Sequence, residues 1–569
     1  MSNKLVQILG HLWNKDTQKE DTNPKSFDVV SFIMLTIATS IALVQFFYNR
    51  SLWNDEAALA LNILHRNPVE LMQPLDIHQS APLGFLLVED FFNTLFPLRE
   101  FGLRVFPLFC YIFSLFLFQS ICRRLIISPY AAICVYGLFA ASPGLLYYAT
   151  DVKQYIVDVM IGLLLIQIYL SQKNKRHYLF ILAIAGIIAP FFSNSSIFIL
   201  AGIGFALLYQ ILVKGWNWKN FSCVAVVGVL WILSFCVYYL IVKDDSLESF
   251  MHLYWLNADP SFLFRQDSFS NCFFVLIRQL VASSSIFFGF FPIIVPICIA
   301  IAFGSVYLIV YCRKNGELCF LCFVPIVCHV IASILEAYPF APRMLLYAIP
   351  LIFLIASPSF SIVFRLTSKK SPLFSKILLF CISVIPFWFL IEIVPLERFE
   401  IKPCLKFINQ NLNPETDKVF VEYSAIRSFR YYSEIGFVSD NVKNCTVGHL
   451  AELPLPNVEK WMKEKKSNIL LQAPFFTGRT WIVMAYNNNF SIVPKHWSNA
   501  WLYKMMNKAN RRKSEGGYSF QQLENYYIQS LIKDNQAILL KEFRAPGASA
   551  LLFDFQGQHT PNASRNLQP

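Results

Sequence analysis

The sequence is short of charge: only 15% of its 569 residues are Asp, Glu, Lys or Arg, whereas 56% are hydrophobic. Soluble globular proteins carry about one quarter charged residues, so this balance excludes that class. Positive charge exceeds negative by 12, but it lies in short clusters between apolar runs rather than in one basic face. Membrane proteins place Lys and Arg in their cytoplasmic connections in this way. The charge therefore indicates a membrane protein and argues against a nucleic-acid partner.

Cysteine motifs and repeats are also scarce. Most of the 14 cysteines stand singly in apolar runs, where Cys acts as a small hydrophobic residue. Cys319 and Cys322 form a lone CxxC with no second pair, which argues against a zinc site. Cys404 and Cys445 lie in the polar C-terminal part and can pair if that part is extracytoplasmic, but their spacing leaves this open. No internal repeat is visible, although many transporters have one.

Long apolar runs fill the first two thirds of the chain. Each is close to the 20 residues that a helix needs to cross hydrocarbon, and they predict a polytopic α-helical membrane protein with about 11 transmembrane helices. The first run lacks a cleavage site and predicts an uncleaved anchor. The expected spans are 28–48, 105–121, 130–146, 154–170, 178–192, 196–213, 221–242, 287–311, 318–335, 344–364 and 376–394.

The apolar run 82–96 is short and carries Glu89 and Asp90, which are costly inside hydrocarbon. We therefore expect an amphipathic helix on the membrane surface. The region 49–104 is then extracytoplasmic, with seven acidic residues against four arginines. The opposite connections contain only basic charges, as the positive-inside bias requires. These are Arg123, Arg124, Lys173, Lys175, Arg176, Lys214, Lys219, Arg313, Lys314, Arg365, Lys369 and Lys370.

These signals divide the chain into four parts. We expect a cytoplasmic tail (1–27), a transmembrane domain (28–395) with outer loops 49–104 and 243–285, an extracytoplasmic mixed α/β domain (396–556) and a disordered tail (557–569). In the α/β domain, residues 418–423, 480–486 and 537–543 predict strands, the first followed by a helix through 432. A further helix is expected near 520–532. The Gln- and Asn-rich composition of the tail predicts its disorder.

Polar side chains recur where the expected spans meet the outer face. Asp55 and Glu56 follow the first span, and a carboxylate there can accept a proton from a hydroxyl nucleophile. The same pair also fits the plain end of a span. Asp151 and Lys153 lie at the outer end of the third span, followed by Tyr155. Lys153 can bind a phosphate as a point charge.

Five more residues complete the candidates. Asp158 lies inside the expected fourth span, where an acid is either functional or holds helices together. Arg104 and Arg343 begin spans at the outer face. Their guanidinium forks suit phosphate, but they can equally reach toward lipid headgroups. His78 and Gln79 can contact a ligand or a divalent ion, although a lone His is more often an ordinary loop residue.

Four short patterns follow one another along the chain: Trp-x-Asp-Glu (53–56), Gln-x-Ala-Pro-Leu (79–83), Leu-Arg-x-x-Pro (103–107) and Tyr-Tyr-x-x-Asp-x-Lys-x-Tyr (147–155). In this order and topology the chain resembles the GT-C superfamily of integral-membrane glycosyltransferases. The resemblance is to the branch of the protein O-mannosyltransferases and aminoarabinose transferases. It covers roughly residues 28–365 and is strongest over 50–158. The C-terminal domain has no such resemblance.

The resemblance implies a reaction and its residues. A sugar would move, with inversion, from a polyprenyl-phosphate donor to a hydroxyl of a lipid, glycan or protein on the extracytoplasmic face of a membrane such as the bacterial inner membrane. Asp55 would be the catalytic acid/base group, with Glu56 beside it and Asp151 as the second acid. Arg104 corresponds to the family's Arg before the second span. The family's basic residue before Pro-Leu is displaced to His78, which leaves Lys153 and Arg343 to bind the donor phosphate.

Two further expectations stay open at this point. A divalent cation could bind at Asp55 and Asp151, and no other cofactor is expected. The alternative to an enzyme is a transporter or lipid-handling membrane protein. A transporter, however, places its polar groups near the middle of the bilayer, whereas here they gather at one face.

Overall fold

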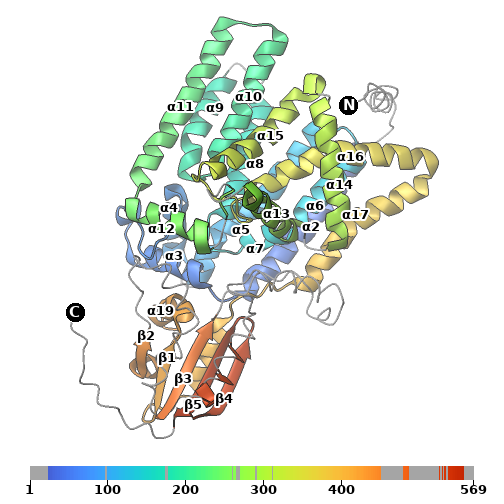
Figure 1. Cartoon of the computed structure of the whole chain (residues 1–569). Helices are drawn as coiled ribbons and strands as arrows, with labels where there is room; N and C mark the ends of the chain where they lie inside the picture. The colour runs from blue at the N-terminus through green and yellow to red at the C-terminus, as the bar shows by residue number, and fades with distance from the viewer. Residues whose placement is uncertain are drawn as a thin grey trace.

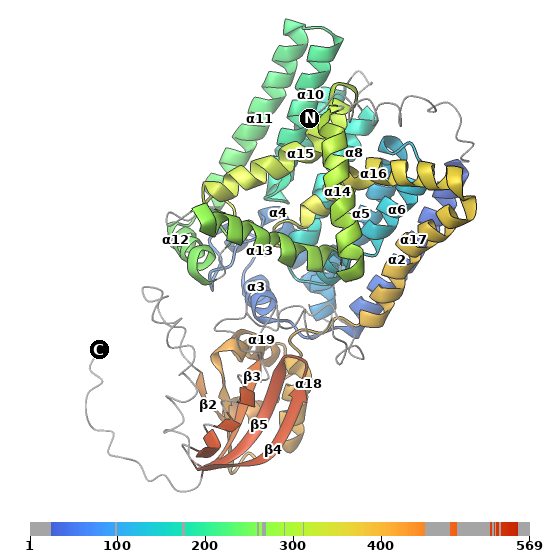
Figure 2. The same cartoon turned by 45° about the vertical axis from the view of Figure 1, so that its right-hand side comes forward.

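The structure is a computed structural model, and it describes residues 24–96, 99–172, 177–258, 261–263, 269–288, 291–310, 312–449, 478–485, 524–525, 528–529, 531–533 and 536–555. Figure 1 shows a large helical part with one small sheet below it, next to α3 and α19. Figure 2 shows the same separation after a turn of the molecule. We call the end of the helical part that faces the sheet the sheet end.

Helices long and apolar enough to cross a membrane make up most of the helical part. Eight of these are found among the described residues, together with four shorter apolar helices. The prediction of a polytopic helical membrane protein is confirmed. The long ones are α2 (Pro24–Tyr48), α5 (Arg99–Leu125), α8 (Tyr155–Gln172), α10 (Ser196–Lys214), α11 (Trp218–Val242), α15 (Cys312–Ile334), α16 (Ile349–Lys370) and α17 (Pro372–Ile393); the shorter ones fall in α6 (Pro129–Ala140), α9 (Tyr178–Ile188) with η2 (Ala189–Phe191), α13 (Phe269–Phe288) and α14 (Phe291–Val310).

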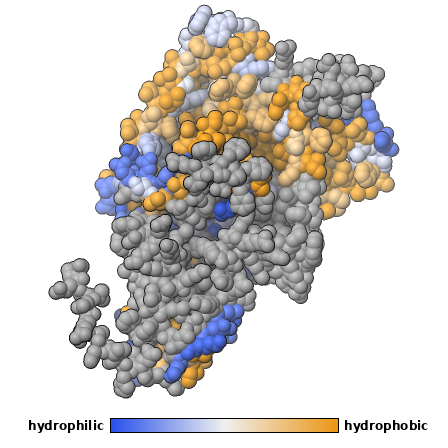
Figure 3. All heavy atoms as spheres, viewed as in Figure 1, coloured by the Kyte–Doolittle hydropathy of each residue, from blue (hydrophilic) through white to orange (hydrophobic). Residues whose placement is uncertain are grey.

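The surface of the helical part matches this role. Large hydrophobic side chains such as Phe32, Phe116, Leu240 and Phe380 are between 45% and 71% exposed. Figure 3 shows hydrophobic residues over the helical part, well away from the sheet. An apolar surface of this extent is stable only against hydrocarbon or another protein. Together with the apolar helices it identifies a multi-pass integral membrane protein.

One expected span and one expected outer loop are divided differently. The span expected at 130–146 breaks after α6, because Pro143 starts a new short helix, α7 (Pro143–Tyr148), and Ser142 Oγ donates to the carbonyl of Phe287 (2.9 Å). Proline favours the first position of a helix. The outer loop expected at 243–285 is largely helical. It contains α12 (Asp245–Leu253), the π-helical turn η3 (Tyr254–Ala258) and most of α13.

The region 49–104 contains α3 (Asn54–His65), η1 (Glu70–Met72) and α4 (Leu83–Leu95). The helix predicted at 82–96 is present as α4, but one of its two acidic side chains, Glu89, does not face water. Glu89 is fully buried, and neither of its carboxylate oxygens has a hydrogen-bond partner among the described residues. Burial raises the pKa of Glu89 well above its ordinary value. The side chain is therefore a neutral acid packed in an apolar contact.

The C-terminal part forms a five-stranded sheet with strand order β2-β1-β3-β5-β4. Strand β1 is parallel to β2 and β3, and β5 is antiparallel to β3 and β4. The elements are α18 (Ile401–Asn411), β1 (Asp417–Val421), η5 (Tyr423–Ala425), α19 (Ile426–Glu434), α20 (Asp440–Asn444), β2 (Thr446–His449), β3 (Gly478–Ala485), β4 (Ala537–Ala545) and β5 (Ala548–Phe555). Helix α18 packs on β4 and β5.

The three predicted strands and the helix through 432 are confirmed as β1, β3, β4 and α19. Strands β2 and β5 were not predicted, and β5 is almost wholly buried between β3 and β4. The described residues within 520–532 are helical. The tail expected at 557–569 lies outside the described residues, as does most of the expected N-terminal tail. Cys404 and Cys445 are free thiols.

Chain direction places the charge clusters relative to the sheet. Helix α2 ends at the sheet end and α5 begins there, so Arg123 in the last turn of α5 lies at the opposite end, paired with Asp28 at the start of α2 (3.2 Å). Lys369 and Lys370 end α16, which also leads away from the sheet end. Basic connections and the sheet are thus on opposite sides of the helical part.

Helices α14 and α16 touch backbone to backbone at Gly304, where an added Cβ would lie 2.0 Å from the carbonyl oxygen of Ile355. We predict that Gly304→Ala destabilises the protein by about 1–3 kcal/mol, because neither backbone can retreat without losing packing. Gly228→Ala is the matched control, since its Cβ would meet nothing within 4 Å. The measurement is the midpoint of thermal unfolding in detergent. Equal midpoints for the two variants would contradict the close contact.

Candidate active site

The site is built on the start of α3. Glu56 is the third residue of this helix, and its Oε2 accepts a hydrogen bond from the backbone N–H of Trp53 (3.1 Å), a standard way to close a helix start. Successive helix residues point about 100° apart. Glu56 therefore turns into the protein and is fully buried, while the side chain of Asp55 is 32% exposed. The two adjacent acids do different things.

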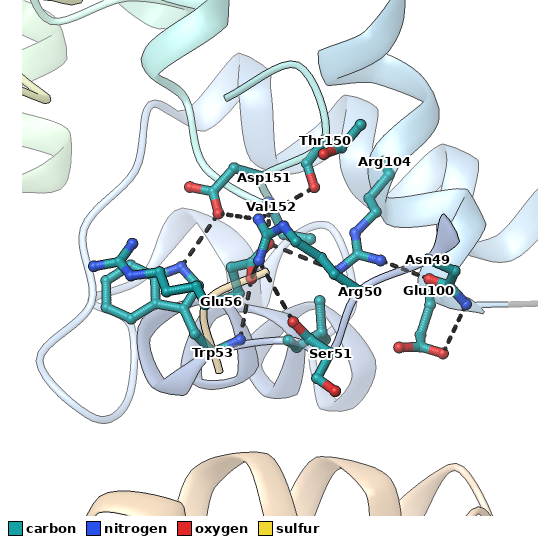
Figure 4. Close-up of polar contacts among 12 residues, drawn as sticks. Asn49, Arg50, Ser51, Trp53, Glu56, Glu100, Arg104, Thr150, Asp151 and Val152 are labelled. Carbon is teal, nitrogen blue, oxygen red and sulfur yellow. Dashed lines mark hydrogen bonds and ion pairs between the residues drawn. The ribbon is translucent and has the colours of Figure 1, made fainter. Parts of the chain in front are cut away.

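Glu56 belongs to a buried ion network centred on Arg50 (Figure 4). The guanidinium of Arg50 donates to both oxygens of Glu56 (2.8 and 3.1 Å) and to Oδ1 of Asp151 (2.7 Å). It also lies 4.5 Å from the ring centre of Tyr147. All three charged side chains are at most 1% exposed. Their charges are therefore stabilised by one another rather than by water.

Neighbouring groups complete this network. The backbone N–H of Val152 donates to Oε1 of Glu56 (2.9 Å), and the indole N–H of Trp53 donates to Oδ1 of Asp151 (3.2 Å). Arg104 lies 3.9 Å from Glu56 and donates to Oδ1 of Asn49 (2.5 Å). Arg104 is also only 1% exposed. Its contacts to Glu56 and Asn49 place it in the buried network.

The two buried acids differ in protonation. For Glu56, burial opposes ionisation, but Arg50 and Arg104 outweigh it, so that its pKa lies below the ordinary value. For Asp151, burial and the neighbouring charge of Glu56 outweigh Arg50 and raise the pKa to about 7. The two carboxyls titrate as a coupled pair, and the surroundings favour the proton on Asp151 over Glu56.

A second, more accessible group lies around Asp55. Arg343 is 3.5 Å from its Oδ2, and the Arg343 guanidinium lies 4.9 Å from the ring centre of Trp255. Lys153 is buried and donates from Nζ to Oε1 of Gln79 (2.7 Å). Burial lowers the pKa of Lys153, and the charge of Asp55 is the largest opposing effect. Asp55, Lys153, Arg343 and Gln79, all singled out from the sequence, are thus brought together.

The turn that supplies Gln79 is strained. Ile77 and His78 have φ values of +59° and +51°, which are unfavourable for a residue with a Cβ and especially for a β-branched one. The turn presents the His78 ring to Phe250 of α12, stacked at 4.4 Å between centres. Strain of this kind persists where surrounding contacts enforce it. His78 therefore packs against an aromatic ring beside the Gln79–Lys153 contact.

Tyr155 and Asp158 end in different surroundings. The Tyr155 ring packs edge-on against the Tyr148 ring, with 5.2 Å between ring centres. Tyr155 also lies within electrostatic range of Asp55, Asp151 and Arg343, so it belongs to the site. Asp158 instead accepts a hydrogen bond from Ser193 Oγ (2.5 Å), in the segment between η2 and α10, and is 4% exposed. This contact fits the helix-packing reading of Asp158 better than a direct role.

Several residues of the site were not recognised in the sequence. Arg50, which centres the network, looked like an ordinary charge at the end of a span. Arg398 lies 4.1 Å from the ring centre of Trp53 and donates to the hydroxyl of Tyr147 (3.1 Å). Glu400 accepts hydrogen bonds from Ser51. The last two come from the segment that leads into the C-terminal domain, and no local pattern marks them.

Asp55 and Asp151 were considered as ligands of a divalent cation. Within the described ranges, no group of three or more His, Cys, Asp or Glu side chains is placed to hold a metal ion. Asp55 faces Arg343, and Asp151 faces Arg50. Each carboxylate already has a cationic partner.

Some solved structures are similar to this chain at low sequence identity. Similar ones are ArnT from Cupriavidus metallidurans in the apo state (13% identity, 91% of this chain and 97% of that chain, TM-score 0.43) and the same protein bound to undecaprenyl phosphate (12%, 91% and 97%, 0.42). A third is the oligosaccharyltransferase AglB from Archaeoglobus fulgidus in complex with an inhibitory peptide and a dolichol-phosphate (11%, 79% and 69%, 0.46). No family model and no curated protein matches the sequence.

The network predicts unequal effects for two isosteric changes. Glu56→Gln removes the negative charge that faces Arg50 and Arg104, and leaving buried cations unpaired costs about 3–5 kcal/mol. Asp151→Asn resembles the protonated acid already favoured there, so we expect a loss of about 1 kcal/mol. Thermal unfolding of both purified variants at pH 6 measures the difference. Equal losses would show that the two acids are not protonated differently.

Proposed function

We propose that the protein transfers a sugar, with inversion, from a polyprenyl-phosphate donor to an acceptor hydroxyl at the sheet end of the membrane, with Asp55 as general base. One observation carries the proposal. Asp55 is a partly exposed carboxylate that lies with Lys153 and Arg343 at the end of a set of membrane-spanning helices. This combination offers a base, a phosphate site and a lipid environment at one place.

The local charge suits a phosphate. In the buried network, Arg50 and Arg104 face Glu56, and Arg50 also faces Asp151. At the accessible group two cations, Lys153 and Arg343, share the one carboxylate of Asp55. The net charge of this group is therefore positive. The guanidinium of Arg343 together with the buried ammonium of Lys153 forms a strong phosphate site. A bound phosphate would stabilise the charged form of Lys153, whose burial without an anion is unfavourable.

The chemistry can be followed atom by atom. A carboxylate oxygen of Asp55 takes the proton from the acceptor hydroxyl, and the hydroxyl oxygen forms a bond to the anomeric carbon. The bond from that carbon to the phosphate oxygen breaks, and its electron pair stays on the phosphate. Lys153 and Arg343 stabilise this developing charge, the effect that commonly contributes most to such catalysis. Because a phosphate leaves as an anion, no second acid is needed to protonate it.

The buried network has a different task in this mechanism. Glu56 closes the first turn of α3 and holds it to Arg50, so it orients Asp55 without touching the substrate. Asp151 and Arg104 act through the same network. Tyr155, Gln79 and His78 surround the accessible group, and Asp158 fixes helix packing. Of the residues proposed from the sequence, Asp55, Lys153 and Arg343 carry the chemistry.

The sheet end is proposed to be extracytoplasmic. Basic connections such as those at Arg123 and Lys369 lie at the opposite end, where the positive-inside bias places the cytoplasm. The polyprenyl tail would lie along the apolar spans, with its phosphate at Lys153 and Arg343. Donor and acceptor then meet at the outer boundary of the membrane.

We expect Asp55→Asn to lower sugar transfer at least about 100-fold, because the amide cannot accept the hydroxyl proton. Transfer of radiolabelled sugar from a panel of polyprenyl-phosphate donors, in membranes with equal amounts of protein, is the measurement. Asp76→Asn is the control, since Asp76 is an exposed acid of the same region paired with Arg66 (2.9 Å). If Asp55→Asn transfers as well as wild type, the proposed base is wrong. If wild type transfers from no donor, the transporter alternative gains support.

Arg343→Gln should weaken binding of undecaprenyl phosphate about 10- to 100-fold, the range for losing charge-assisted hydrogen bonds. Binding of undecaprenol, which lacks the phosphate, should stay unchanged. Arg66→Gln serves as the control, because Arg66 pairs with the exposed Asp76 rather than with Asp55. Detergent-solubilised protein and a fluorescent lipid displacement assay are sufficient. An equal loss for both lipids would mean that Arg343 supports the fold and not the phosphate.

A further inference from the structure

Residues 50–53 join α2 to α3 and belong to no helix or strand. Polar backbone groups in such a segment still need partners when they are buried. Ser51, Leu52 and Trp53 are all buried. The hydrogen-bond partners of Ser51 and Leu52 hold the entry to α3, and therefore Asp55, in place. These partners belong to the C-terminal domain.

The start of α18 binds Ser51 and Asn49. Glu400 accepts from both the backbone N–H and the hydroxyl of Ser51 (2.9 and 3.0 Å). The backbone N–H of Lys402 donates to the same hydroxyl (3.0 Å), and Lys402 Nζ donates to the carbonyl of Asn49 (2.5 Å). Glu400 is 4% exposed, so water does not replace these contacts. The start of α18 therefore binds both the backbone N–H and the hydroxyl of Ser51.

Helix α19 binds the next residue. The backbone N–H of Leu52 donates to the hydroxyl of Tyr432 (2.8 Å), and the hydroxyl of Ser428 donates to the carbonyl of Leu52 (2.9 Å). The Tyr432 hydroxyl also donates to Glu100 Oε1 at the start of α5 (2.8 Å). Tyr432 and Ser428 are fully buried. Both polar groups of the Leu52 backbone therefore depend on the C-terminal domain.

We propose that the C-terminal domain is a clamp that positions the catalytic base, formed by Arg398, Glu400, Lys402, Ser428 and Tyr432. The clamp holds residues 49–53, with Arg398 covering the Trp53 ring, and Asp55 follows two residues later on α3. Its effect on sugar transfer rests on the proposed function, whereas its hold on the segment does not. The clamp residues touch no substrate and act as positioning residues.

Positioning has a specific kinetic signature. A clamp that fixes the orientation of α3 matters most when Asp55 contacts the acceptor hydroxyl. If Asp55 is misplaced, the chemical step in the substrate-bound enzyme becomes slower. Donor phosphate binding by Lys153 and Arg343 uses other segments. Loosening the clamp should therefore lower kcat and leave the KM for the donor nearly unchanged. A general loss of folded protein would instead lower the active fraction without changing local backbone protection.

Tyr432→Phe tests the clamp with a close control. It removes one hydroxyl that accepts from Leu52 and donates to Glu100. Tyr431→Phe removes a hydroxyl from the adjacent residue of the same helix, equally buried, whose oxygen has no hydrogen-bond partner among the described residues. Hydrogen–deuterium exchange of peptides covering 49–56 in the full-length protein, together with kcat and donor KM, provides the readouts.

For Tyr432→Phe we expect about tenfold faster exchange in that peptide and about tenfold lower kcat, with donor KM within about twofold. Tyr431→Phe should match wild type in all three. Unchanged exchange in Tyr432→Phe would overturn the clamp, and faster exchange with unchanged kcat would overturn its positioning role. If the wild-type protein transfers no sugar, the proposed function fails, while the exchange of residues 49–56 still decides whether the clamp holds the segment.

Discussion

The pairing of Arg50 with Glu56 and Asp151 is the interaction on which the rest of the site depends. It joins the end of α2, the first turn of α3 and the segment between α7 and α8 through one guanidinium with almost no exposure to water. Such a group is costly to bury alone but stable when two carboxylates and an aromatic face surround it. Because the charge is shared internally, the neighbouring carboxylate of Asp55 stays available at the surface of the same helix.

The site therefore has two layers with separate tasks. Arg50, Glu56, Asp151 and Arg104 form a buried layer that fixes backbone positions. Asp55, Lys153 and Arg343 form a second group at the end of the apolar helices, in which Asp55 and Arg343 are partly exposed and Lys153 is buried. The two layers meet at α3, where one turn of helix contributes to both. This division explains how a carboxylate can remain accessible next to so many arginines: the strongest pairs are formed elsewhere.

Much of the architecture could be predicted from the sequence, because a membrane imposes one clear requirement on segment length and polarity. The expected site residues around Asp55 also came together, since they lie at the sheet end of the helical part. Local sequence could not separate Asp55 from Glu56, because the side that faces inward is chosen by Arg50, which also binds Asp151 across 101 positions. Glu400 and Tyr432 lie 349 and 380 positions from their partners. No pattern within a short window reports contacts of that range.

The contacts from α18 and α19 also set an order of events during synthesis. Membrane helices can enter the bilayer as they emerge from the ribosome, beginning with α2. Ser51 and Leu52 receive the hydrogen bonds from α18 and α19 only when residues up to Tyr432 have been made and have reached the same side of the membrane. A growing chain whose spans are all inserted would still lack the hydrogen bonds that fix Ser51 and Leu52 before α3. The first loop to leave the ribosome is thus among the last to reach its final form.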